Sequence, residues 1–160
     1  MGLETTTSDA GGPRSETLES ADAPWQDDPW LGRVASWDDA EADAAIREGL
    51  PIDLAAHLQK LLELTDEEAA QLIGRSRSTY ARYRNAGRNL GMAEAERAVR
   101  LAQLIALAAE TFGTISEALS WMREANYALG GRVPFDLAET DPGARVVRNL
   151  LYGIQHGHPV

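Results

Sequence analysis

The chain has 160 residues, no cysteine and three histidines, and its 15 basic and 25 acidic residues give a net charge of −10. This length suits one modest domain or two small ones with a tail, and the lack of cysteine excludes disulfides and thiolate metal sites. No apolar run approaches the roughly 20 residues needed to cross a bilayer, and no signal sequence opens the chain. We therefore expect a cytoplasmic protein that uses no metal or other cofactor.

Residues 1–34 are rich in Ser, Thr, Gly, Pro and acidic residues. Such a segment buries too little apolar surface to offset the entropy lost on ordering, so we predict a disordered acidic arm over residues 1–34. Trp25 and Trp30 are the exceptions. Two interpretations remain open: they dock on the folded body or on a partner, or they are isolated aromatic residues of a flexible arm.

Helical spacing of apolar residues begins after Ser36, which can cap a first helix that ends at Glu48, before Gly49. A second helix is predicted over residues 52–64. Its apolar face is formed by Leu54, Leu58, Leu61 and Leu62.

Residues 65–85 predict two short helices joined by a tight turn. Thr65 can cap the first helix, Glu68 completes a capping box, and Gly74 ends the helix. The second helix, residues 76–85, is rich in Ser, Thr, Tyr and Arg. This is the layout of a helix-turn-helix, in which the second helix enters the major groove of DNA.

Basic residues are concentrated around this second helix. Residues 75–100 carry seven basic and two acidic residues, whereas every other part of the chain is net acidic. DNA responds to the charges within a Debye length of roughly 8–10 Å, so the local patch predicts DNA binding despite the acidic total. The alternative is that these arginines only solvate exposed helix faces. Their position directly after a capped helix and a glycine turn favours DNA binding.

The N-terminal end of the second helix should meet DNA first, through Ser76, Arg77, Ser78 and Thr79. Arg77 and Arg82 are the candidates for guanine contacts, because a guanidinium matches O6 and N7 of guanine. Phosphate contacts are expected from Arg75, Tyr83, Arg84 and Arg88. In an alternative that the sequence leaves open, Ser78 and Thr79 only cap the helix.

Three more helical segments follow. An Ala-rich helix over residues 93–111 offers a face for close approach, and we expect it at a dimer surface. Thr114 and Glu117 form a second capping box for a helix that ends near Ala125. Residues 126–137 should form a loop, and Asp141 with Pro142 should begin a last helix that ends near Gly157. We predict an all-α fold, with a helix-turn-helix region at 35–112 and a small helical domain at 113–160.

An ordered series of motifs runs through residues 52–160. Ser76 and Thr79 form S-x-x-T, and Glu94 and Arg97 form E-x-x-R on the long helix. A block follows with Trp121, Asn126, Leu129, Gly130, Gly131 and Pro134, and then a ladder of Gly143, Val147, Leu150, Ile154 and Gly157. This series resembles the antitoxins of bacterial RES–Xre toxin–antitoxin pairs, the Xre/MbcA/ParS group. The acidic arm lies outside the resemblance, and Ala95–Glu96 stands where the group usually has serine and an acidic residue.

The resemblance implies two activities. The helix-turn-helix would bind double-stranded operator DNA at the pair's own promoter. If DNA is bound, we expect a homodimer, because dimers read paired half-sites. The C-terminal domain would bind the cognate RES-domain toxin, an enzyme that consumes NAD⁺, block its active site, and form higher hetero-oligomers with it. The toxin-binding candidates are Trp121, Asn126, Leu129, Gly130, Arg132, Pro134, Arg148, Tyr152, Gln155, His156 and His158.

Other interpretations stay open. Trp121, Leu129 and the apolar ladder also fit a small C-terminal core, and residues 152–158 fit an ordinary frayed chain end. The alternative function is a stand-alone transcriptional regulator whose C-terminal domain serves dimerisation or ligand binding. A third is an interaction protein whose helix-turn-helix no longer binds DNA. The chain has no phosphate loop, nucleophile elbow or metal-ligand spacing, so we expect no enzyme activity.

Overall fold

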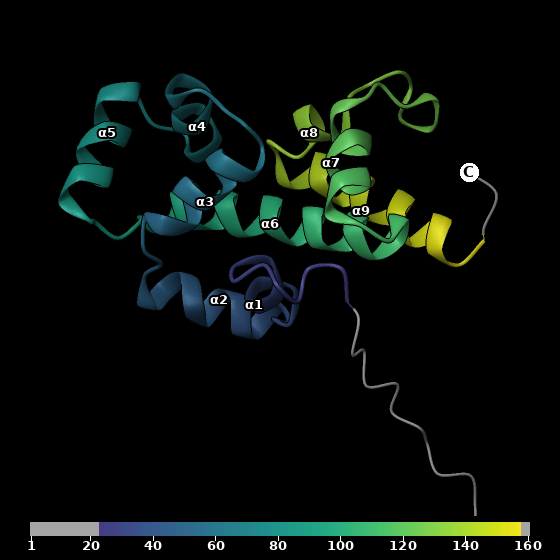
Figure 1. Cartoon of the computed structure of the whole chain (residues 1–160), viewed down its shortest axis with the longest axis horizontal. Helices are drawn as coiled ribbons and strands as arrows, with labels where there is room; N and C mark the ends of the chain where they lie inside the picture. Colours follow the sequence, from purple (N-terminus) through teal and green to yellow (C-terminus); the bar gives the residue numbers. More distant parts are fainter. Residues whose placement is uncertain (1–22, 158–160) are drawn as a thin grey trace, which may run out of the picture.

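The computed structural model describes residues 23–157, and these residues form helices with no strand (Figure 1). In chain order the elements are α1 Leu31–Ala35, α2 Asp39–Glu48, α3 Asp53–Leu61, α4 Asp66–Ile73, α5 Arg77–Ala86, α6 Met92–Phe112, α7 Ile115–Arg123, the 3-10 helix η1 Tyr127–Leu129, α8 Pro134–Leu137 and α9 Asp141–Gln155. The prediction of an all-α protein with a helix-turn-helix is confirmed.

Helix α6 runs through the middle of the molecule, and the other elements are arranged along it (Figure 1). Helices α1 to α4, α7 and α9 all contact it. Its buried residues include several alanines, whose small side chains let neighbouring backbones approach closely. The Ala-rich face that we expected at a dimer surface is therefore covered by the chain itself, since Ala98, Ala102 and Ala108 are fully buried.

The predicted disordered arm, residues 1–34, is wrong for residues 23–34. Residues 23–37, the N-terminal strap, form turns and α1, and they pack against the body. Leu31 and Val34 are fully buried, and Trp25, Trp30 and Trp37 pack around the core. The acidic composition of the arm as a whole concealed this short apolar segment. Residues 1–22 lie outside the described residues.

The side chain of Asp28 joins the strap to α3. Asp28 Oδ1 accepts hydrogen bonds from the backbone N–H groups of Trp30 at 3.1 Å and Leu31 at 2.8 Å. The other oxygen of Asp28, Oδ2, lies 2.8 Å from Nε2 of His57 on α3. This single carboxylate therefore both begins α1 and joins the strap to the helix-turn-helix part, which the sequence did not predict.

Two helix starts differ from the prediction. Asp38, not Ser36, caps α2, because Asp38 and Glu41 complete a capping box with N–O distances of 2.8 and 2.9 Å. Thr140, not Asp141, caps α9, and its hydroxyl accepts a hydrogen bond from the Gly143 N–H at 3.2 Å. The predicted loop over residues 126–137 contains two short helices, η1 and α8.

Two arginines join the C-terminal helices to the helix-turn-helix part. Arg100 on α6, only 7% exposed, donates from Nε to the Ala138 carbonyl at 3.1 Å and from a terminal nitrogen to the Glu139 carbonyl at 2.9 Å. Arg123 at the end of α7 donates to the carbonyl of Leu62, which follows α3. The described residues therefore form one packed body rather than two domains on a flexible linker.

Candidate nucleic-acid and partner-binding surfaces

Two tyrosines anchor α5 to the body. Tyr80 is fully buried, and its hydroxyl donates a hydrogen bond to Oε1 of Gln59 on α3 at 2.7 Å. Burial raises the pKa of Tyr80, because the charged phenolate is less well solvated inside the protein. Tyr83 is only 8% exposed. Its predicted role as a phosphate contact is wrong, because the side chain is part of the core and faces away from the outer side of α5.

The start of α5 is formed by local hydrogen bonds and a glycine turn. The Thr65–Glu68 capping box of α4 forms as predicted, and its hydrogen bonds lower the pKa of Glu68. Gly74 has φ +73°, and a Cβ there would collide with the guanidinium of Arg97 on α6. The Ser76 hydroxyl then accepts from the Thr79 N–H at 3.2 Å, so Ser76 is the cap of α5. The sequence left open whether Ser78 and Thr79 contact DNA or only cap the helix. Neither residue is the cap of α5, because Ser76 occupies that position.

Three of the predicted DNA-contacting arginines have partners within the chain. Arg75 pairs with the buried carboxylate of Glu94, whose hydrogen bond and charge raise the pKa of Arg75. Arg84 lies 3.5 Å from Asp66 and 3.3 Å from Oε1 of Gln59. The guanidinium of Arg88 lies 5.0 Å from the ring centre of Tyr83. These contacts hold all three arginines beside the tyrosine-bearing side of the helix.

Two other arginines, both on α5, differ from these three. Arg77 and Arg82 are exposed and have no ion pair or hydrogen bond from their side chains within residues 23–157. With about 3.6 residues per turn, Ser78, Ala81, Arg82 and Asn85 lie on the outer face of α5, opposite Tyr80 and Tyr83. Arg77, three residues before Tyr80, lies at the edge of this outer face in the first turn. Asn85 was not among the predicted DNA contacts. Its position three residues after Arg82 is the signal that would have found it, and its amide matches the N6 and N7 groups of adenine.

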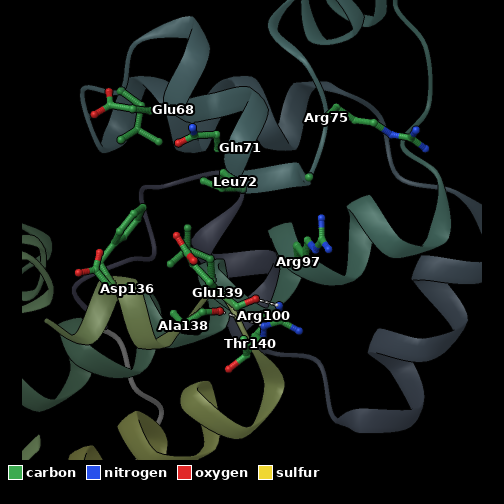
Figure 2. Close-up of a pocket in the computed structure, with 14 residues that line it drawn as sticks. Glu68, Gln71, Leu72, Arg75, Arg97, Arg100, Asp136, Ala138, Glu139 and Thr140 are labelled. Atoms are coloured by element: carbon green, nitrogen blue, oxygen red, sulfur yellow. Dashed lines mark hydrogen bonds between the residues drawn. The ribbon is translucent and has the colours of Figure 1, made fainter. Parts of the chain in front are cut away.

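A groove of about 770 Å³ lies where α4 faces α6 and the turn between α8 and α9 (Figure 2). Arg97 points from α6 toward the end of α4, while Asp136 and Glu139 border the groove from the C-terminal part. Glu94, the partner of the groove residue Arg75, also accepts a hydrogen bond from the Gly91 N–H at 2.5 Å. Basic and acidic side chains both line the groove, so it is not a uniformly basic site for an anion.

Several predicted toxin-binding residues build the loop after α7. Leu129 is 3% exposed and Pro134 is buried, so these two are packing residues and the prediction of direct contact is wrong for them. Asn126 caps η1 by accepting from the Ala128 N–H at 2.9 Å. Gly130 has φ +67°, which glycine adopts without the steric cost of a side chain. Arg132 is exposed, and its Nε donates to the Leu129 carbonyl at 3.0 Å.

The accessible candidates lie mainly on α9. Tyr152 is 46% exposed, Gln155 and His156 are exposed, and Nδ1 of His156 lies 2.7 Å from the Tyr152 carbonyl oxygen. Arg148 is half-buried, as is Trp121, whose ring lies 5.3 Å from that of Phe112. His158 lies outside the described residues. Two exposed apolar side chains were not predicted: Val146, at 44%, and Tyr127, at 96%.

Two family models match neighbouring parts of the chain: the Antitoxin Xre-like helix-turn-helix domain over residues 41–103, and the Antitoxin Xre/MbcA/ParS C-terminal toxin-binding domain over residues 107–157. The chain belongs to the Xre-type antitoxins. A curated relative, "Antitoxin Xre" of Photorhabdus laumondii subsp. laumondii, is 26% identical over 116 residues, which are 72% of this chain and 78% of the relative.

In this Xre-type antitoxin the first match ends and the second begins inside α6, so one continuous helix belongs to both domains. Within the described residues no group of His, Asp and Glu is placed to hold a metal ion. No single helix there is long and apolar enough to cross a membrane. Helices α6 and α7 meet that test only as a pair, bent by 113°.

Replacing Tyr80 with Phe is expected to lower the free energy of unfolding by about 1 kcal/mol, because the hydrogen bond to Gln59 is lost. The pKa of Tyr80 is raised on folding from an unfolded value of about 10, so the wild type loses stability as the pH rises from about 10 through the raised pKa. The Phe variant lacks this contribution. Denaturant unfolding across the alkaline range measures both effects.

The matched control is Tyr127→Phe, which removes the same hydroxyl from a side chain that is 96% exposed. It should leave the free energy of unfolding at neutral pH unchanged. If the stability of Tyr80→Phe declined in parallel with the wild type throughout the alkaline range, the buried phenol would not be the source of the effect.

Proposed function

We propose that this Xre-type antitoxin binds a RES-domain toxin that consumes NAD⁺, blocks the toxin's active site, and represses its own operon as a dimer on operator DNA. It acts in the cytoplasm and catalyses no reaction of its own. The observation that carries this proposal is the arrangement of two exposed surfaces on one body. Helix α5 lies near one end of α6, and α7 and the end of α9 lie near the other (Figure 1).

The DNA half of the proposal is supported by the outer face of α5. Arg77 and Arg82 have no partner among the described residues, so their guanidinium groups are available for base edges. Asn85 adds an amide on the same face. In contrast, Arg75, Arg84 and Arg88 are positioned beside the helix by Glu94, Asp66 and Tyr83, where they can meet phosphates. Two copies of α5 would read half-sites about 34–36 Å apart.

The toxin half of the proposal is supported by the exposed side of α9. Val146 and Tyr152 are large apolar residues with 44% and 46% of their surface exposed. Gln155 and His156 follow on the same helix end. Aromatic and apolar groups that are exposed among polar neighbours are typical of surfaces that bind another protein. A plug into a nucleotide-binding site can use such aromatic and polar side chains to displace ligand contacts.

Co-expression with the toxin encoded in the same operon tests the proposal. The wild-type chain should co-purify with the toxin and keep cellular NAD⁺ at the level of toxin-free cells. The variant Tyr152→Arg should fail to protect NAD⁺, because the introduced charge opposes burial of the exposed ring position. Met92→Arg is the matched control: its side chain is 55% exposed at the other end of α6, and it should protect NAD⁺ fully.

No complex and no preservation of NAD⁺ with the wild-type chain would contradict the toxin half. Sequence-specific DNA binding that survived in the same preparation would then leave a stand-alone transcriptional regulator. A complex that forms while NAD⁺ is still consumed would show that the toxin is bound away from its active site.

Arg82→Ala should relax the preference for one base position of the operator at a cost of roughly 1–3 kcal/mol. The control is Arg84→Ala, which removes the same charge from a side chain that is paired with Asp66 and Gln59. It should weaken binding to all sequences by a similar and smaller factor. Binding measured against operators with single base changes distinguishes the two. Equal weakening of every sequence by Arg82→Ala would contradict a base-reading role.

A further inference from the structure

A second groove, of about 480 Å³, lies between the N-terminal strap, the start of α2, and helices α6 and α9. Trp25 and Trp37 border it from the strap, and Asp39 borders it from the first turn of α2. Glu110 lies on the α6 side, and Tyr152 on the α9 side. This groove is separate from the mixed-charge groove beside α4 and from the outer face of α5.

The lining of this groove has the chemistry of a receptor for a guanidinium group. It contains three aromatic rings and three carboxylates, from Trp25, Trp37, Tyr152, Asp38, Asp39 and Glu110. Asp38 is engaged in capping α2. Asp39 and Glu110 are exposed, and their carboxylates have no hydrogen bond or ion pair within residues 23–157. A planar cation gains both from stacking on aromatic rings and from charge-assisted hydrogen bonds to free carboxylates.

The strap already holds one guanidinium in this way. The Cζ atom of Arg33 lies 5.6 Å from the ring centre of Trp30 and 5.6 Å from that of Trp37. The rings of Trp25 and Tyr152 carry no such cation among the described residues. The contacts of Arg33 therefore show that an arginine side chain can stack on tryptophan rings of the strap.

Two observations indicate that the cation belongs to a protein. The α9 wall of the groove includes the side chain of Tyr152, which is exposed over 46% of its surface and which a small ion would leave uncovered. Arg148 lies on the same wall, so a carboxylate beside the incoming cation would also find a partner. Alternating charges with apolar contacts between them are typical of the edge of a protein interface.

We propose that this groove receives an arginine side chain from a basic segment of the toxin, with Asp39 and Glu110 as its ion-pair partners and the strap tryptophans as its stacking surface. This inference rests on the proposed function. It extends the toxin-binding surface beyond the two family domains, because the match to the helix-turn-helix model begins only at residue 41, after the strap. The strap thus forms a wall of the groove that lies outside both family matches.

The test compares the affinities of full-length variants for the purified toxin of the same operon, by calorimetry. The double variant Asp39→Asn/Glu110→Gln should bind roughly tenfold more weakly or worse, because both ion pairs with the arginine are lost. Glu110→Arg alone should weaken binding further through repulsion. The matched control is Glu48→Gln/Glu63→Gln, which removes two exposed carboxylates that do not line this groove, and it should bind within about twofold of the wild type.

Operator binding by the same preparations serves as the test of folding and should not change. Toxin affinities equal to that of the control would overturn the inference and leave the proposed function intact. Tighter toxin binding after deletion of residues 1–22 would also overturn it, because the chain's own N-terminal segment would then be the occupant. A wild-type chain that bound no toxin would overturn the proposed function, and this inference with it.

Discussion

The fold depends above all on the burial of α6. Most of this helix is covered on several sides, and its alanines allow α1, α7 and α9 to pack directly against it. Both family domains share the helix, because one match ends and the other begins within it. The C-terminal helices and the helix-turn-helix therefore pack on one continuous helix, with no linker between them.

Arginine has two separate tasks in this chain. Arg75, Arg84, Arg100 and Arg123 make intramolecular contacts that hold turns and neighbouring helices together. Arg77 and Arg82 have no such contacts among the described residues; Arg82 lies on the outer face of α5 and Arg77 at its edge. A basic patch in the sequence is thus only partly a DNA-binding surface. The rest of it makes contacts within the chain, in a protein whose total charge is strongly negative.

Local features could be predicted from the sequence, and features that depend on distant residues could not. The Thr65–Glu68 box, the Gly74 turn and the Thr114 cap each depend on residues within one helical turn, and all three form. The pairing of Arg75 with Glu94, which joins residues 19 positions apart, left no local signal. Burial of Tyr83 and Leu129 likewise depends on the packing of other helices. The strap was missed because two buried residues, Leu31 and Val34, lie inside an otherwise acidic segment.

In the proposed function, one body presents a DNA-reading face and a toxin-binding face near opposite ends of α6 (Figure 1). The most direct test is to titrate purified toxin into a preformed complex of the antitoxin with its operator and to follow the complex by gel mobility and mass. A slower, heavier species that contains toxin, antitoxin and DNA is the predicted result. Release of free DNA at stoichiometric toxin would contradict the claim, because the two surfaces would then overlap or exclude each other.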